Sequence, residues 1–157
     1  MTASGRLLRV RMYGTPRCAT SSSTTRKLRC NSVTPIITEV IGDLIFQSRH
    51  NARGSVWSAT GNTSYLITKT YELLGRLRGK YTYGHRYVEH LLTPDEQALM
   101  AAAWPREATR DENRRAARAL WTWTKFVWSE AERAIGQPLG LEIDEVEMWV
   151  AIDRMYT

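Results

Sequence analysis

Apolar residues from position 34 onward recur mostly at spacings of three and four, which predicts helices. The strongest pattern follows Thr34 and Pro35, which read as the N-cap and first position of a helix ending near His50. Its inward positions are Ile36, Ile37, Val40, Ile41, Leu44 and Ile45. The small polar residues and glycines of 51–62 predict a loop, and a second helix is expected over 63–78.

The rest of the chain predicts three or four further helices. A short one is expected over 84–92, and a helix capped at Thr93 ends before Pro105. The longest covers 109–135, with Thr109 and Asp111 at its start and Gly136 and Pro138 stopping it, and the last covers 142–155. The expected packing positions of the last two are Ala116, Leu120, Trp123, Val127, Ala131 and Ala134, then Val146, Trp149, Val150 and Ile152. Almost no strand is indicated, so we expect an all-α, antiparallel bundle of five to six helices.

Positive charge is concentrated at the start of the chain. The net charge is +6, yet the residues from Glu39 onward hold 15 basic and 16 acidic side chains. The segment before them has no Asp or Glu and seven basic residues: Arg6, Arg9, Arg11, Arg17, Arg26, Lys27 and Arg29. The helical body is therefore nearly neutral, and the overall charge does not indicate a nucleic-acid-binding fold.

Residues 1–33 differ in composition from the helical body at 34–157. They contain an unbroken Ser/Thr run over 20–25 and few large apolar residues, so we expect a basic, disordered tail. Two other interpretations stay open. An Arg- and Ser-rich segment without acids is typical of an organellar transit peptide, and it also arises when the start of a gene is translated in the wrong frame.

Several protein classes are disfavoured. No apolar run approaches the length of a transmembrane helix, so no membrane partner is expected and the cytoplasm is the default location. Cys18 and Cys30 make neither a disulfide framework nor a four-cysteine zinc site. His85 and His90 are five apart and would point to different helix faces, and no phosphate-binding glycine motif is present. We therefore expect no metal and no cofactor in this chain.

The first expected helix carries a line of polar residues that includes candidates for a catalytic role. Glu39, Asp43 and Gln47 stand at i, i+4 and i+8, and therefore on one helix face. A carboxylate there that faces a partner domain could act as general base toward a hydroxyl group. The alternative is an ordinary solvated face of an amphipathic helix.

The tryptophans have two interpretations as well. The chain has six: Trp57, Trp104, Trp121, Trp123, Trp128 and Trp149. An aromatic wall could stack on a base or a sugar, whereas large aromatics at helical spacing are typical of a core or an interface. Trp121 and Trp128, seven apart, adjoin the main stripe of the longest helix, which indicates that another chain or domain covers more than one of its faces. A homodimeric interaction module is thus one alternative.

Arg78 and His85 have six residues between them and match the loose R-x(4–6)-H pattern of a family of helical ribonucleases. Cleavage of RNA needs a base for the 2′-hydroxyl and a cation for the phosphate, which such a pair could supply. Gly79 stands where that pattern usually has a polar residue. A stand-alone, toxin-like ribonuclease is therefore a second alternative, and nucleic acid is expected as a partner only under it.

From Glu39 onward, about three quarters of the chain, the order of features resembles the C-terminal helical domain of aminoglycoside nucleotidyltransferases of the kanamycin type. Five stretches carry the resemblance: 39–46 on the first helix, the 51–54 loop, 65–74, the 81–83 turn and the Trp-rich helix 114–135. The resemblance implies a helical domain that forms walls of an aminoglycoside cleft and supplies an acidic base. Asp43 and Glu39 are the candidates for that base. The alternative is that Gln47 occupies the matching helical turn, in which case the base is absent from this chain.

The same resemblance implies that a separate half of the enzyme is missing. In that family a Gly-Ser followed by an Asp-x-Asp pair holds the metal for Mg-ATP, and this chain has no Asp-x-Asp. The expected function is therefore the substrate-binding domain of an antibiotic-resistance transferase, truncated or frame-disrupted upstream and inactive alone. Its expected partners are a small-molecule aminoglycoside and either the missing nucleotidyltransferase domain or a second copy of the chain.

Overall fold

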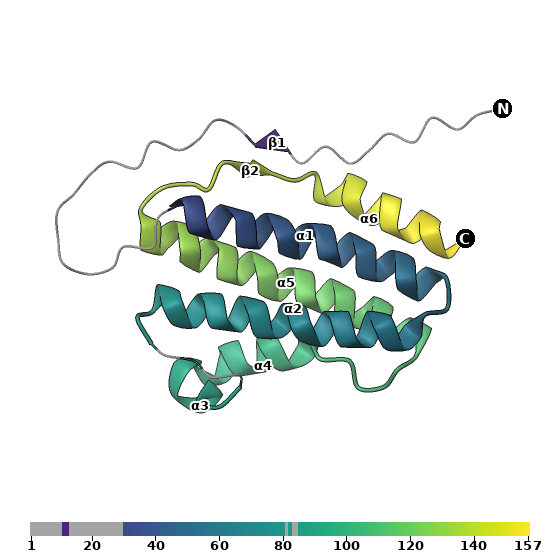
Figure 1. Ribbon diagram of the computed structural model, residues 1–157, viewed down its shortest axis with the longest axis horizontal. Coiled ribbons are helices and arrows are strands. Elements are labelled where there is room, and N and C mark those ends of the chain that lie inside the picture. Colours follow the sequence, from purple (N-terminus) through teal and green to yellow (C-terminus); the bar gives the residue numbers. More distant parts are fainter. Residues whose placement is uncertain (1–10, 13–29, 81, 83–84) are drawn as a thin grey trace.

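The computed structural model describes residues 11–12, 30–80, 82 and 85–157. Of the tail at 1–33, only residues 11–12 and 30–33 are described. The expectations for its other residues lie outside the described part of the chain, as does part of the expected turn at 81–83. The described body is an all-α bundle, which confirms the predicted fold class (Figure 1).

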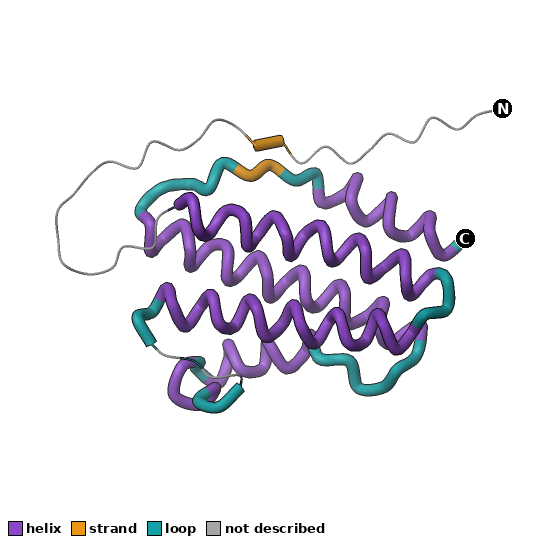
Figure 2. Tube along the Cα trace, in the orientation of Figure 1, coloured by secondary structure: helices purple, strands orange, loops and turns teal. Residues whose placement is uncertain are grey.

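Three long helices and one of ten residues run alternately up and down the bundle, and shorter elements complete it (Figures 1 and 2). The elements are α1 (Cys30–Ala52), α2 (Val56–Leu77), α3 (Val88–Leu91), α4 (Pro94–Ala103), α5 (Arg110–Ile135) and α6 (Glu145–Asp153), which a 3-10 turn follows. The short strand β1 (Arg11–Met12) pairs antiparallel with β2 (Leu141–Glu142). Helix α5 packs against α1, α2 and α4 and is the centre of the bundle.

The core follows the stripe predicted for α5. Leu120, Trp123 and Val127 are fully buried against apolar residues of α1 and α2. The indole N–H of Trp123 donates to the hydroxyl of Thr70 at 2.8 Å, so the largest core side chain has its polar atom satisfied. The expectation for Ala134 is wrong: it is exposed in the last turn, shortly before the chain turns away from the helix.

Helix α1 begins at Cys30, four residues before the predicted cap at Thr34. Val33 is fully buried, because it extends the apolar stripe one turn before Ile37. Pro35 therefore lies inside the helix. Pro35 is the sixth residue of α1 and has no N–H, so the helix lacks one intrahelical backbone hydrogen bond just after its first turn.

The predicted loop over 51–62 is wrong, because α2 already begins at Val56. The hydroxyls of Thr60 and Thr63 donate to backbone carbonyls four residues earlier, and both side chains also bond to neighbouring helices. The side-chain amide of Asn62 donates to the backbone carbonyl of Asp43 at 3.2 Å. The small polar residues that predict a loop thus lie between packed helices, where their side chains find hydrogen-bond partners.

The predicted caps are confirmed where local signals were strongest. Thr93 forms a capping box at α4, Thr109 caps α5, and Gly136 ends α5 with a φ of 79°. Helix α3 is shorter than expected. In α6 the expectation for Ile152 is confirmed, whereas those for Val146 and Val150 are wrong, since both are exposed and Met148 is buried instead.

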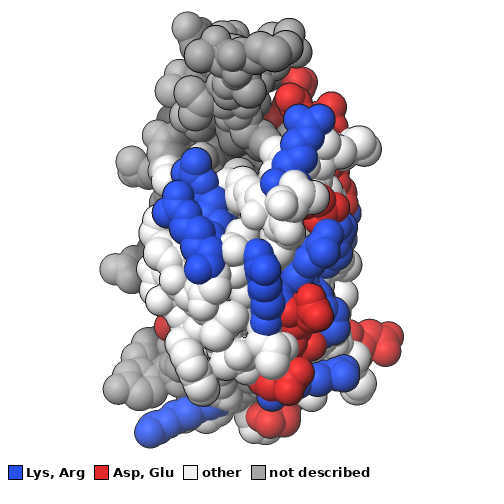
Figure 3. Space-filling model, turned by 90° about the vertical axis from the view of Figure 1, so that its right-hand side faces the viewer, with Lys and Arg blue, Asp and Glu red and all other residues white. Residues whose placement is uncertain are grey.

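Arginines gather at the end of the bundle where α1 turns into α2 and α5 begins. Figure 3 looks at this end and shows Lys and Arg side chains over much of it, with acidic side chains mostly toward one margin. The arginines of these segments are Arg49, Arg53, Arg110, Arg114, Arg115 and Arg118, with Arg154 after α6, and they outnumber the acids Asp111, Glu112 and Asp153. The local charge of this face is therefore positive, although the body as a whole is nearly neutral.

Candidate functional site

The polar line on α1 faces α2 for most of its length. Glu39 is exposed and forms an ion pair with Lys69 of α2. Gln47 is only 1% exposed, and its amide oxygen lies 2.6 Å from the hydroxyl of Thr63. The interpretation as a solvated face thus holds for Glu39 but not for Gln47.

Asp43 lies between these two residues and is half-buried. Burial raises the pKa of its carboxyl, the neighbouring charge of Glu39 raises it further, and Lys69 acts in the opposite direction. Glu39 is held by Lys69, whose pKa is lowered by burial but raised overall by its bonds to Glu39 and Tyr65. Glu39 is thus engaged in an ion pair, whereas the pKa of Asp43 moves in the direction that a general base requires.

A small hollow lies beside this line. It has a volume of about 230 Å³ and is lined by Ile36, Tyr65, Thr68, Lys69, Glu72, Leu73 and Arg76. Asp43 is not part of its lining. The hollow is smaller than most sites that enclose a drug-sized molecule, so it does not supply Asp43 with a substrate cavity.

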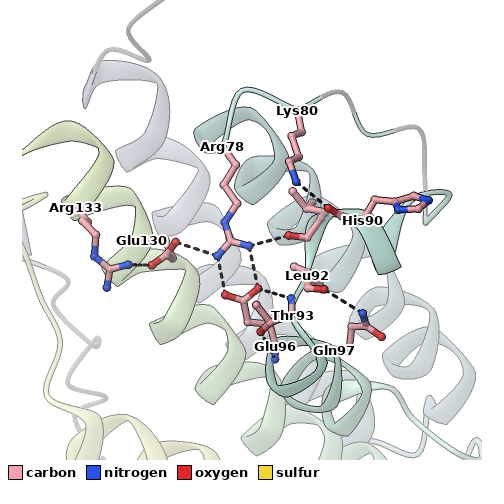
Figure 4. Close-up of polar contacts among 10 residues, drawn as sticks. Arg78, Lys80, His90, Leu92, Thr93, Glu96, Gln97, Glu130 and Arg133 are labelled. Carbon is pink, nitrogen blue, oxygen red and sulfur yellow. Dashed lines mark hydrogen bonds and ion pairs between the residues drawn. The ribbon is translucent and has the colours of Figure 1, made fainter.

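Arg78 has a structural role at the end of α2 (Figure 4). Its guanidinium donates to both carboxylate oxygens of Glu96, at 2.9 and 2.7 Å, to Glu130 at 3.0 Å and to the carbonyl of Leu91 at 2.9 Å. The hydrogen bonds that Arg78 donates to Glu96 are the main reason that the pKa of Arg78 is raised. The side chain thus ties α2 to α4 and α5.

His85 lies in a different environment. Its Nε2 is 3.3 Å from the hydroxyl of Thr68, and its ring stacks on Tyr71 and meets the edge of Trp104. Within the described residues no contact joins His85 to Arg78. A phosphate would have to displace two carboxylates from Arg78, which disfavours the pair as a ribonuclease site.

A larger groove, which the sequence did not predict, lies between α5 and the chain that follows it. Its volume is about 620 Å³, within the range of small-molecule sites. It is lined by Trp121, Lys125, Trp128, Ser129 and Glu132 of α5 and by Leu141, Glu142, Ile143, Asp144 and Glu145. None of these residues belongs to α1 or α2, so the groove and Asp43 are on different elements.

Two carboxylates organise the groove. The indole N–H of Trp128 donates to Glu132 at 2.8 Å, and the backbone N–H of Leu139 donates to the same carboxylate oxygen at 3.0 Å. Asp144 caps α6 by accepting from the backbone N–H of Glu147 at 2.9 Å. These bonds hold one indole in place and fix the returning chain against α5.

The groove already holds one ammonium group, which belongs to the protein. The Nζ of Lys125 is 2.8 Å from the carboxylate of Glu145 and 5.8 Å from the ring centroid of Trp121. Lys125 is the main cause of the lowered pKa of Glu145, to which the indoles of Trp121 and Trp149 also contribute. With four carboxylates and one lysine in the lining, the groove favours organic cations.

Part of a signal for this groove was present in the sequence. Trp121 and Trp128 adjoin the core stripe, and acids recur at Glu142, Asp144 and Glu145. Only the reversal of the chain after α5 brings the two sets together, and that reversal places Trp121 at the base of the groove with 3% of its surface exposed.

Neither a membrane-spanning helix nor a group of three potential metal ligands occurs among the residues that the structure describes. Comparison with known proteins gave no significant match to a family model, to a curated protein or to a solved structure.

Proposed function

We propose that this chain is a helical binding domain for an amino sugar of the aminoglycoside type, equivalent to the substrate-binding half of a kanamycin-type nucleotidyltransferase. The observation that carries the proposal is the groove beside α5, with two indoles, four carboxylates and one lysine in its lining. The all-α bundle is compatible with such a domain. The resemblance over residues 39–135 supplies the substrate class.

The chemistry of the groove supports this ligand. An aminoglycoside carries several ammonium groups on sugar rings that have apolar faces. Carboxylates form short, charge-assisted hydrogen bonds with ammonium groups, and indole faces attract both the cation and the C–H face of a sugar. Lys125 between Glu145 and Trp121 illustrates how one such ammonium is held here.

Nucleotide transfer needs more than this domain. In-line attack on ATP requires metal ions that bridge the phosphates, and the resemblance assigns their ligands to a separate half. A general base must lie within hydrogen-bond reach of the hydroxyl that it activates, and Asp43 is not among the residues that line the groove, so a sugar held there has no base from α1. We therefore expect the purified chain to bind an aminoglycoside without adenylylating it.

Calorimetric titration with kanamycin tests the proposal. The variant Glu142→Gln/Glu145→Gln should weaken binding at least about tenfold, since two charge-assisted bonds are lost. Asp43→Asn is the matched control, because it removes one carboxylate outside the groove and should leave the affinity unchanged. Loss of binding in Asp43→Asn alone would place the sugar on the α1–α2 face, and absence of binding by the unmodified chain would overturn the proposal.

A further inference from the structure

The most exposed large apolar side chain of the described residues is Trp57, the second residue of α2, which is 79% exposed. An indole in this position costs the protein favourable burial and has no described packing partner. It directly follows the turn that carries Arg53, and Arg49 lies one helical turn earlier in α1. Both arginines are exposed, and no described ion pair involves either of them.

A third arginine is fixed beside the same turn. Arg110, the first residue of α5, donates a guanidinium hydrogen bond to the backbone carbonyl of Ala52. Its guanidinium also lies over the ring of Tyr156, 5.5 Å from the centroid. Arg49 and Arg53 therefore come from the end of α1 and the turn before Trp57, and Arg110 is bonded to that same turn. The end of the bundle to which these segments belong faces the viewer in Figure 3.

A buried polar network holds this surface rigid. Asn51 donates to the carbonyl of Arg110 at 2.7 Å and to the hydroxyl of Tyr156 at 2.9 Å. Asn113 donates to the carbonyl of Val56 at 2.9 Å and to the side-chain oxygen of Asn51 at 3.3 Å. The start of α5 is thus tied to both ends of the α1–α2 turn, which fixes the backbone that carries Arg53, Trp57 and Arg110.

We infer that this surface, Arg49, Arg53, Trp57 and Arg110, binds single-stranded nucleic acid. Guanidinium groups form bidentate hydrogen bonds with phosphates, and an exposed indole stacks on an unpaired base of any sequence. A duplex offers the arginines the same charge but presents no free base face to Trp57. A second copy of this chain fits less well, because a twofold contact would bring the same arginines together.

Fluorescence anisotropy with a labelled 12-nucleotide oligouridine tests the inference. Trp57→Ala should weaken binding about tenfold, and Trp57→Phe should restore part of the loss, because base stacking contributes at this level and phenylalanine retains an aromatic face. Arg49→Ala/Arg53→Ala should reduce the slope of log affinity against log salt by about 1.4, the value for two lost phosphate contacts on a single strand.

The control is Arg76→Ala, which removes an exposed arginine near the far end of α2 and should change neither the affinity nor the salt dependence beyond the loss of one distant charge. Because the replaced residues are exposed, circular dichroism should show folded protein in every variant. The inference is overturned if Trp57→Ala binds as tightly as the unmodified chain, or if a duplex of equal length binds equally well. A concentration-dependent dimer that Trp57→Ala abolishes would also overturn it.

Discussion

Arg78 and Glu96 form a bidentate ion pair, with N–O distances of 2.9 and 2.7 Å, that joins the end of α2 to the first turn of α4. Glu96 also accepts from the backbone N–H of Thr93 at 3.0 Å, so one carboxylate serves both the ion pair and the helix cap. Glu130 of α5 bonds to the same guanidinium. A single arginine thereby fixes the relative positions of three helices.

Arg78→Ala should lower the free energy of unfolding by about 3 kcal/mol, because it leaves the partly buried carboxylate of Glu96 without its cation and removes one of the two arginines that pair with Glu130. Urea unfolding followed by circular dichroism measures the change. Arg76→Ala is the control: that arginine is exposed and pairs only loosely with Glu72, so its loss should cost less than about 0.5 kcal/mol. Equal stability of the two variants would contradict a structural role for Arg78.

Glu112 should make the protein sensitive to acid. Arg115 is the main cause that lowers the pKa of this carboxyl from 4.5 to about 2. A lowered pKa in the folded state stabilises the protein above pH 4.5, and this contribution is lost as the pH falls from 4.5 toward 2. The free energy of unfolding should therefore fall less steeply over this range in Glu112→Gln than in the unmodified chain. Parallel pH curves for the two proteins would disprove the prediction.

The contribution of Asp43 to the pH dependence of stability should have the opposite sign to that of Glu112. Its pKa is raised from 3.8, first by burial and then by Glu39, so ionisation of Asp43 destabilises the folded state as the pH rises past 3.8. We expect Asp43→Asn to be at least as stable as the unmodified chain at pH 7. Carbon-detected NMR titration should give an Asp43 pKa above 3.8, and Glu39→Gln should bring it closer to that value. A pKa at or below 3.8 would argue against Asp43 as the base.

Two glycines of α2 should respond in opposite ways to alanine. A Cβ at Gly75 would collide with the side-chain methyl of Thr82 and lie 3.4 Å from the carbonyl oxygen of Lys80, so Gly75→Ala should destabilise the protein by about 1–3 kcal/mol. A Cβ at Gly61 meets nothing within 4 Å, and Gly61→Ala should stabilise the helix by about 0.5–1 kcal/mol. Thermal unfolding of both variants measures the difference, and a stabilised Gly75→Ala would show that Thr82 does not pack there.

The sequence alone determined the elements that depend on neighbouring residues. Thr93 before Pro94 and Glu96, Thr109 before Asp111, and Gly136 after Ile135 marked helix ends correctly, because caps act on backbone groups within one turn. The long apolar stripe of α5 likewise indicated both a helix and the buried side of it.

Only the tertiary structure decided which hydrogen-bond partners the polar side chains find and which surfaces meet. Thr60 and Thr63 are compatible with a helix because Asn113 and Gln47 on other helices bond to them, and no local pattern contains those partners. The groove beside α5 needs the chain to reverse and return along Trp121 and Trp128. Local signals act within a few residues, whereas these sites join side chains that are far apart in sequence, and packing alone brings them together.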